Sequence, residues 1–329
     1  MMKPEQILAG IVRGDRRSLS KAITLVESHR PDHREQALWL MNHIPLVQDS
    51  LRIGISGPPG VGKSTFIETF GLKQLAQGHK VAVLAVDPSS SLTHGSILGD
   101  KTRMPQLATH PDSFIRPSPA GETLGGVTRR TREAIFLCEA AGFDRIIVET
   151  VGVGQSETAA SSMVDLFLLL QLPNAGDDLQ GIKKGILEIA DLVLINKTDG
   201  NQVKAAKRAQ SDLQSALGLV FRKEQIPQVL CCSALEKKGM DDVNQAINAI
   251  IKTKIQDGRF LAKRQNQALQ WFDQGLREEI LFALQNNPQF SSLTQQIRQQ
   301  VHQLKKTPST AIQEILKQFT IYIQGTENE

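Results

Sequence analysis

The chain has 329 residues, of which 40% are hydrophobic and 22% charged, and this composition excludes wholesale disorder. Its 38 basic and 34 acidic residues leave a net charge of +4 and are spread along the chain. This even spread argues against a nucleic-acid-binding or membrane-binding surface. Three cysteines and seven scattered histidines without metal-ligand spacing argue against a disulfide framework and against a zinc or nickel site.

Residues 1–48 are predicted to form an N-terminal helical extension. Leu19, Ile23 and Val26 recur at helical spacing, and Pro45 marks the end of the helical pattern. The first residues are polar and do not resemble a signal peptide, and no apolar run is long enough to span a bilayer. We therefore expect a cytoplasmic protein.

From Leu51 onward, short runs of Val, Ile and Leu alternate with helical stretches. Continuous apolar runs of this kind are typical of parallel strands that are buried on both faces. The expected strands are Leu51–Ser56, Lys80–Val86, Arg145–Glu149, Leu166–Leu172, Leu192–Asn196 and Gln228–Cys232. The pattern predicts an α/β fold over residues 49–257, a doubly wound and mainly parallel sheet with its ligand site at the carboxyl ends of the strands.

A glycine-rich loop follows the first expected strand and precedes a helical run. The loop has the pattern GxxxxGK[ST], in which glycines let backbone N–H groups wrap around phosphate oxygens. It comprises Gly57, Pro58, Pro59, Gly60, Val61, Gly62, Lys63, Ser64 and Thr65. We expect Lys63 to reach the β- and γ-phosphates of a nucleotide and the Ser64 hydroxyl to ligate Mg²⁺.

Acidic residues follow two other expected strands at the same edge of the sheet. Asp87 ends the second strand, and Asp100 lies in the loop beyond it. Glu149 ends the strand that begins at Arg145 and is followed by Gly152, whose N–H we expect to meet the γ-phosphate. Carboxylates in these places suit direct or water-mediated Mg²⁺ binding, so Asp87, Asp100 and Glu149 are candidate metal ligands beside Ser64. For Asp87 and Asp100, the alternative is a turn or helix cap.

A water-orienting glutamine immediately after Gly152 is missing. The nearest one is Gln155, three residues further on. We therefore assign no catalytic glutamine and predict slow intrinsic turnover.

The nucleotide base is expected to be read by the tetrapeptide Asn196-Lys197-Thr198-Asp199, which follows the strand Leu192–Asn196. In such an NKxD arrangement the aspartate accepts hydrogen bonds from guanine N1–H and from the N2 amine, which adenine cannot supply. An unpaired carboxylate against adenine makes the discrimination on the order of 10⁴ or more. Asn196 can tie this loop to the phosphate-binding loop, and the Lys197 stem can lie over the base. The motif predicts a GTP-binding protein rather than an ATP-binding one.

A further loop after the strand Gln228–Cys232 is expected to complete the base site. Ser233, Ala234 and Leu235 offer backbone N–H groups to guanine O6, which is a supporting signal because of their place after the guanine-reading strand. Cys231 and Cys232 are expected to be ordinary buried strand residues.

From about Gly258 the strand pattern stops, and residues 258–329 are predicted to be helical. Leu269, Phe272, Leu276 and Ile280 recur at helical spacing, and Thr307–Ile323 is a further helical candidate. The stripe is compatible with a helical cap on the sheet domain and with an arm that packs against a second copy of the chain.

Several of these motifs together resemble the MeaB/ArgK family, the GTPases associated with methylmalonyl-CoA mutase. The resemblance rests on Asp87-Pro-Ser-Ser-Ser, Gly99-Asp-Lys-Thr-Arg-Met104, Glu149-Thr-Val-Gly-Val-Gly-Gln-Ser-Glu157, Pro173-Asn-Ala-Gly-Asp-Asp-Leu-Gln-Gly-Ile-Lys183-Lys184-Gly185 and Asn196-Lys-Thr-Asp199, and it covers nearly the whole chain. It implies a G-protein chaperone that gates cofactor loading into an adenosylcobalamin-dependent mutase and protects that mutase. It also implies a homodimer formed through the C-terminal arm, and a switch over Gln171–Lys184 in which Lys183 reaches the nucleotide. For this segment the alternative is an ordinary solvated loop.

Three other functions remain open. The first is a nucleotide-dependent kinase or ATPase linked to amino-acid transport, against which the guanine motif argues. The second is a metal-insertion GTPase, which would need a His- or Cys-containing relay that the chain lacks. The third is a nucleotide-dependent scaffold whose output is binding alone.

Overall fold

The computed structural model describes residues 2–28, 30–86, 103–117, 124–150, 155–173, 184–221 and 226–326. The chain divides into two compact units, residues 1–267 and 268–329. The helix α12 (Arg259–Asn286) runs across the division between them. In the described part of the chain, every helix is too short or too polar to cross a lipid bilayer.

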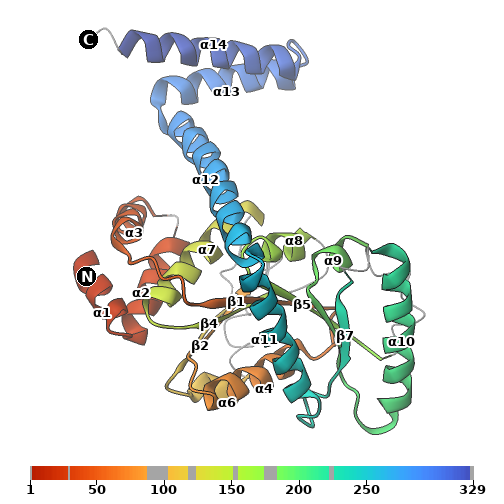
Figure 1. The fold of residues 1–329 in the computed structure, drawn as a ribbon. Helices are drawn as coiled ribbons and strands as arrows, with labels where there is room; N and C mark the ends of the chain where they lie inside the picture. The colour runs from red at the N-terminus through yellow and green to blue at the C-terminus, as the bar shows by residue number, and fades with distance from the viewer. Residues whose placement is uncertain are drawn as a thin grey trace. The chain divides into compact units, whose positions relative to one another are not determined.

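The first unit is built on a seven-stranded sheet in which every paired strand is parallel (Figure 1). The strand order is β3-β2-β4-β1-β5-β6-β7. Strands β2 to β4 are therefore added on one side of β1 and β5 to β7 on the other, as in a doubly wound fold. The strands are β1 (Leu51–Ser56), β2 (Val81–Val86), β3 (Ser113–Arg116), β4 (Arg145–Thr150), β5 (Leu166–Gln171), β6 (Leu192–Ile195) and β7 (Gln228–Cys231). The predicted α/β class is confirmed, and β3 is an additional edge strand that the sequence pattern did not indicate. With four residues in the order Ser-Phe-Ile-Arg, it lacks the continuous apolar run of the inner strands.

Helices cover both faces of this sheet. Helices α4 and α6 lie on one face and α7 and α8 on the other (Figure 1). The bounds are α4 (Lys63–Ala76), α6 (Pro105–Thr109), α7 (Leu124–Ala140), α8 (Gln155–Ser161), α9 (Lys184–Ile189), α10 (Val203–Val220) and α11 (Met240–Gln256), with a short 3-10 helix η2 at Gly200–Gln202. The larger core cluster joins Ile53 and Ile55 of β1 to Phe66 and Phe70 of α4, all of them fully buried. A parallel sheet covered on both faces explains why the central strands read as continuous apolar runs.

Three helices precede the sheet: α1 (Pro4–Val12), α2 (Arg16–Glu27) and α3 (Pro31–His43). The Asp15 carboxylate caps α2 by accepting hydrogen bonds from the backbone N–H groups of Arg17 and Ser18. Helix α2 packs against α1, α3 and α7, and its apolar stripe Leu19, Ile23 and Val26 is buried. The N-terminal helices are thus attached to the sheet through α7.

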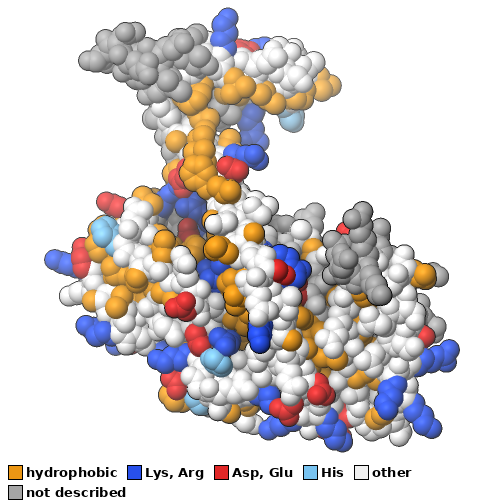
Figure 2. All heavy atoms as spheres, viewed as in Figure 1, with side chains coloured by type: hydrophobic (Ala, Val, Ile, Leu, Met, Phe, Trp, Pro, Cys, Tyr) orange, Lys and Arg blue, Asp and Glu red, His pale blue; other side chains and the backbone are white. Residues whose placement is uncertain are grey.

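The second unit contains the rest of α12 together with α13 (Pro288–His302) and α14 (Pro308–Thr326). Helices α13 and α14 pack against each other, and Phe290 stacks edge-on against Phe319. By contrast, Leu269, Phe272 and Leu276 of α12 are 63%, 64% and 48% exposed. Figure 2 shows hydrophobic side chains gathered along the surface of α12. This unit therefore has a small core of its own and an uncovered apolar face.

Candidate nucleotide-binding site

The glycine-rich loop joins β1 to α4 at the centre of the sheet. A side chain at Gly57 would place its Cβ 2.6 Å from the carbonyl oxygen of Leu170 on β5, so only glycine fits there. Gly62 caps α4 with a φ of 91°, and the N–H of Phe66 donates to its carbonyl at 2.9 Å. The preceding N–H groups of the first turn have no acceptor within the helix and carry its positive dipole end. This loop has the form of an anion cradle.

Lys63 begins α4 and folds back over the loop. Its Nζ donates to the carbonyl oxygens of Gly57 at 2.8 Å and of Pro58 at 3.3 Å. Burial lowers the pKa of Lys63 below its ordinary value, and the charge of Arg103 acts in the same direction. The carboxylates of Glu149 and Glu157 act in the opposite direction, favouring the charged ammonium. The lysine is therefore partly desolvated among carbonyl and carboxylate oxygens, and an incoming phosphate can replace the two carbonyl contacts.

Asn196 joins three loops at the end of β6. Its Nδ2 donates to the Val61 carbonyl in the glycine-rich loop at 2.8 Å, and its Oδ1 accepts from the Ala234 N–H at 3.1 Å. The Cys232 thiol also donates to this Oδ1 at 3.8 Å. Asn196 is only 1% exposed, so it forms a fixed strut between the phosphate-binding and base-binding loops.

The Asp199 carboxylate is held in place from the neighbouring loop. Ser233 Oγ donates to its Oδ2 at 2.5 Å, and the N–H of Glu236 donates to the same Ser233 hydroxyl at 3.1 Å. Lys197, two residues earlier, has a φ of 59°, and its Cε lies 3.7 Å from where a Cβ of Gly62 would be. The Lys197 stem therefore lies beside the glycine-rich loop, and the Asp199 carboxylate is oriented by the loop that follows β7.

The backbone N–H groups after β7 differ in their availability. Ser233 N donates to the Lys238 carbonyl, and Ala234 N donates to Asn196 Oδ1. Leu235 N has no acceptor within the described residues. Of the three groups expected to meet guanine O6, the Leu235 N–H is thus the one that has no partner in the described part of the chain.

The residues present also fit a magnesium ion. Ser64 lies one residue into α4, and its hydroxyl makes no hydrogen bond to the described residues. Glu149 is the last residue but one of β4 and pairs in register with Ile55 of β1, the strand that leads into the loop, and it is 5% exposed. Hydroxyl and carboxylate oxygens are ligands that Mg²⁺ prefers. No cluster of three or more His, Cys, Asp or Glu side chains that could hold a metal ion occurs among the described residues.

Four of the expected site residues, Asp87, Asp100, Gly152 and Lys183, lie outside the described residues.

Sequence reasoning gave no role to several residues that the fold brings to the site. Thr69 Oγ1 on α4 donates to the Ala234 carbonyl at 2.9 Å and so links the helix to the base-binding loop. Glu157 on α8 is 2% exposed and acts electrostatically on Lys63. Cys232, expected to be an ordinary core residue, contacts Asn196. Only Glu157 had a sequence signal, its place at the end of the motif that starts at Glu149.

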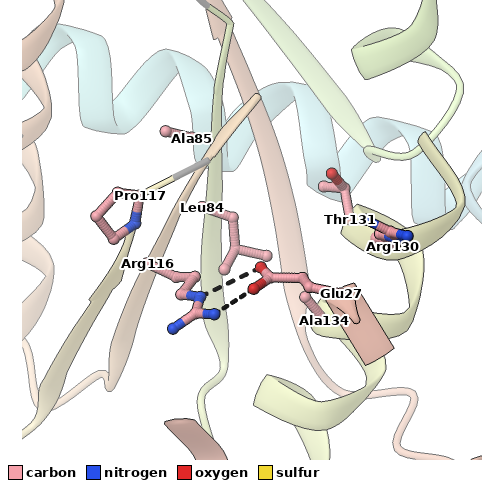
Figure 3. Close-up of a pocket in the computed structure, with 8 residues that line it drawn as sticks. All are labelled: Glu27, Leu84, Ala85, Arg116, Pro117, Arg130, Thr131 and Ala134. Atoms are coloured by element: carbon pink, nitrogen blue, oxygen red, sulfur yellow. Dashed lines mark hydrogen bonds and ion pairs between the residues drawn. The ribbon is translucent and has the colours of Figure 1, made fainter. Parts of the chain in front are cut away.

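A second hollow at the carboxyl ends of β2 and β3 is too small for a substrate. Figure 3 shows Arg116 and Glu27 pointing toward each other across it, with Leu84 and Ala85 of β2 beside them. Its volume is about 10 Å³, room for roughly one water molecule. The ion pair connects α2 to β3, so the residues around this hollow attach the N-terminal helices to the sheet.

Comparisons with known proteins agree with this geometry. The family model described as "Methylmalonyl Co-A mutase-associated GTPase MeaB" matches residues 19–289. A protein of Mycobacterium tuberculosis named as a probable GTPase is 50% identical over 314 residues, which cover 94% of each chain. GTPase ArgK of Escherichia coli is 47% identical over 315 residues, covering 95% of this chain and 94% of the relative.

A mouse relative and a solved structure extend the likeness. The methylmalonic aciduria type A homolog, mitochondrial, of Mus musculus is 43% identical over 328 residues, covering 96% of this chain and 79% of the relative. A crystal structure described as an LAO/AO transport system kinase superposes with a TM-score of 0.73 at 39% identity, covering 97% of this chain and 98% of the other. The matches at 40–50% identity and the family model extend over the loops that hold Lys63, Asn196 and Asp199. This chain binds guanine nucleotides, hydrolyses GTP and belongs to the MeaB family of methylmalonyl-CoA mutase-associated GTPases.

Proposed function

We propose that this GTPase is a G-protein chaperone of an adenosylcobalamin-dependent methylmalonyl-CoA mutase. Its nucleotide state gates the loading of the cofactor into the mutase and protects the mutase from inactivation. The family description and the name of the mouse relative support this partner. The site in this chain supports the switching, as follows.

The carboxyl end of β5 contacts both nucleotide loops and carries the proposal. The Leu170 carbonyl lies against Gly57 of the glycine-rich loop, and the Gln171 carbonyl accepts the N–H of Asn196 at 2.8 Å. The segment that leaves this strand end, Gln171–Lys184, is the expected switch. A change in either loop when GTP becomes GDP would displace Gln171, the first residue of that segment. This connection supports a role of the segment in reporting the nucleotide state to a partner.

Within the nucleotide site we assign the following roles. Ser64 and Glu149, with Asp87 and Asp100, hold Mg²⁺, which neutralises charge on the β- and γ-phosphates when bound. Lys63 replaces its contacts to Gly57 and Pro58 by contacts to phosphate. Gly152 meets the γ-phosphate, and Lys183 approaches the nucleotide when the mutase complex assembles. Asp199, held by Ser233, reads the guanine edge.

Single-turnover GTP hydrolysis with and without a purified adenosylcobalamin-dependent mutase tests the chaperone. We expect the mutase to accelerate hydrolysis and GTP to change the rate of adenosylcobalamin transfer into the mutase. Lys183→Ala should lose the acceleration while keeping basal hydrolysis by the isolated protein, and Lys207→Ala on α10 is the matched control. Unchanged hydrolysis and unchanged cofactor transfer in the presence of the mutase would leave a plain scaffold as the better description.

We further propose that the protein is a homodimer formed through its C-terminal helices. Leu269, Phe272, Leu276 and Ile280 lie on one face of α12 at a spacing of three and four residues, and all are at least 44% exposed. A helical apolar face of this extent is favourable to bury against a second copy. Sedimentation velocity should give a dimer for the full chain and a monomer for Phe272→Glu/Leu276→Glu. A dimer that persists in this variant would exclude the face as the interface.

The description of one solved relative as a transport system kinase makes protein phosphorylation the second candidate. The Asn196–Asp199 loop favours GTP over ATP, which argues against an ATP-dependent kinase. Incubation with γ-labelled ATP or GTP and cell extract distinguishes the two functions. A chaperone GTPase releases labelled phosphate only from GTP and transfers none to protein.

A further inference from the structure

Hydrolysis by this chain needs a positive group that meets the charge developing on the γ-phosphate. In P-loop GTPases an arginine supplied within the chain or by a partner can meet that charge. The chain has no glutamine immediately after Gly152 to orient the attacking water. A cation close to the glycine-rich loop would therefore contribute directly to the rate.

The residues that follow Arg103 are held against α4, the helix that begins at this loop. Its neighbour Met104 is 1% exposed in the core cluster that contains Phe66 of α4. Immediately beyond, the backbone N–H groups of Gln106 and Leu107 donate to Glu68 Oε1 of α4 at 2.7 and 3.4 Å. These contacts fix the backbone on which the Arg103 side chain stands.

The contacts between α6 and α4 also show in which direction the chain of α6 runs along α4. Leu107 lies against Gly71 in the middle of α4, with two side-chain carbons 3.0 Å from the position of an added Cβ. The amide of the preceding residue, Gln106, lies on Glu68, one turn nearer the N-terminus of α4. Continued backward along the chain, this direction leads from Gln106 toward the first turn of α4, where Lys63 begins the helix, and from it we infer that Arg103 lies near that turn. The electrostatic influence of Arg103 on the pKa of Lys63 agrees with this placement.

Arg103 has no carboxylate partner in the part of the chain that the structure describes. Its side chain is exposed, and the ion pairs among the described residues join other groups. Two cations near each other repel, and an anion that binds between them attracts both and offsets that repulsion. A triphosphate in the glycine-rich loop is such an anion. The arrangement thus favours nucleotide binding at a place where charge grows during hydrolysis.

We propose that Arg103 is a catalytic arginine supplied within the chain, whose guanidinium contacts the γ-phosphate and stabilises the transition state of GTP hydrolysis. Water attacks the γ-phosphorus as the bond to the bridging β–γ oxygen breaks, and GDP and phosphate leave. Arg103 donates hydrogen bonds to non-bridging or bridging oxygens and gains or loses no proton. This proposal rests on the GTPase activity of the isolated protein and not on its partner, so it can fail while the chaperone proposal stands.

The test measures ground-state and transition-state binding separately in the full-length protein. Arg103→Ala should lower single-turnover GTP hydrolysis about 100-fold or more, since an arginine in this role contributes on the order of 10³ or more to the rate. Its affinity for GDP alone should change less than about threefold, whereas its affinity for GDP with aluminium fluoride, an analogue of the transition state, should fall by the larger factor. Arg103→Lys should recover only part of the rate, because lysine keeps the charge without the planar fork.

Arg208→Ala on α10 is the matched control. Arg208 is an exposed arginine whose carboxylate neighbour, Asp212, is 3.8 Å away, and its loss should leave both affinities and the rate unchanged. Unchanged hydrolysis in Arg103→Ala would overturn the proposal. So would an equal loss of GDP and GDP–aluminium fluoride binding, which would make Arg103 a ground-state anchor. Thermal melting of each variant identifies a folding defect. If Arg103→Ala is misfolded, the affinities of Arg103→Lys for GDP and for GDP with aluminium fluoride are compared instead, and an equal loss of both would overturn the proposal.

Discussion

At the scale of single residues, the proposed base site depends on a carboxylate whose direction is set by a neighbouring hydroxyl. Ser233 Oγ donates to Asp199 Oδ2 at 2.5 Å, which leaves Oδ1 for a base donor and limits rotation of the carboxylate. The pairing joins residues 34 positions apart. A site organised in this way discriminates strongly, because a base with the wrong edge leaves the buried polar groups unsatisfied.

Asp199→Asn should move the preference from GTP to XTP. The amide presents a donor where guanine also presents donors, whereas xanthine presents a carbonyl oxygen there. We expect GTP affinity to fall by a factor on the order of 10³ and XTP affinity to rise, measured by competition with a fluorescent nucleotide. Asp212→Asn on α10 is the control for loss of a carboxylate. An unaltered preference would contradict the assignment of Asp199 to the base.

The cysteines give a second residue-scale prediction. Burial raises the pKa of Cys232 to about 12, and it also raises the pKa values of Cys138 and Cys231. A raised thiol pKa lowers the reactive thiolate fraction at neutral pH. At pH near 8 the folded protein should therefore react slowly with iodoacetamide, with the half-buried Cys231 first, and urea should expose all three. Peptide mass spectrometry reads the order, and faster labelling of Cys232 than of Cys231 in the folded protein would contradict its burial.

At the scale of elements, contacts within the protein pack the two nucleotide loops against each other. Gly62 lies at the start of α4, where a Cβ would come 2.9 Å from Asn196 Nδ2. That close approach lets Asn196 reach the Val61 carbonyl. The distance between phosphate-binding and base-binding groups is thus set by protein–protein contacts, which lowers the cost of organising the site on binding.

Gly62→Ala should weaken GDP and GTP binding strongly, by about tenfold or more, because it strains a φ of 91° and displaces Asn196. Gly78→Ala is the matched variant: its φ is 87°, but no atom lies within 4 Å of the added Cβ. It should cost similar stability in thermal melting and leave nucleotide affinity intact in calorimetry. Equal losses of affinity in the two variants would mean that backbone strain alone, and not the contact with Asn196, explains the effect.

At the scale of the whole molecule, a buried ionic network holds together the amino ends of the strands, at the opposite end of the sheet from the proposed nucleotide site. Asp165, 1% exposed at the start of β5, accepts from the Arg52 N–H at 2.9 Å and from two nitrogens of Arg264 at 2.8 and 2.7 Å. Arg52 in turn forms two hydrogen bonds with Glu139 of α7 at 2.7 and 2.9 Å. The network joins β1, β5, α7 and the first turns of α12 within the first unit.

Asp165→Asn should lower the free energy of unfolding by about 3 kcal/mol, since it leaves the Arg264 guanidinium, 13% exposed, without its carboxylate. Urea denaturation measures the change from the first unfolding transition. The control Asp212→Asn, which alters an exposed and distant ion pair, should change the free energy of unfolding by less than about 0.5 kcal/mol. Nucleotide affinity in Asp165→Asn should stay close to that of the original chain, because the network lies at the amino ends of the strands. A large loss of affinity would show that this edge is coupled to the site.

The sequence by itself determined the strands and the chemistry of the loops. Continuous apolar runs predicted six of the seven strands, because a parallel strand buried on both faces leaves that pattern. GxxxxGK[ST] and NKxD pointed to a guanine nucleotide, because each residue type has its own hydrogen-bonding chemistry. The four-residue edge strand β3 has no such pattern, so the sequence did not reveal it.

Only the tertiary structure decided which residues meet across the chain. Asn196 contacts Val61, Cys232 and Ala234 because β1, β6 and β7 end on the same side of the sheet, and Glu68 of α4 accepts hydrogen bonds from backbone N–H groups of α6. These contacts join positions 36 to 135 residues apart, and no local pattern records them. The physical reason is that propensity and hydrophobic periodicity act over a few turns of chain, whereas the partner of a buried polar group is chosen by the packing of the whole sheet.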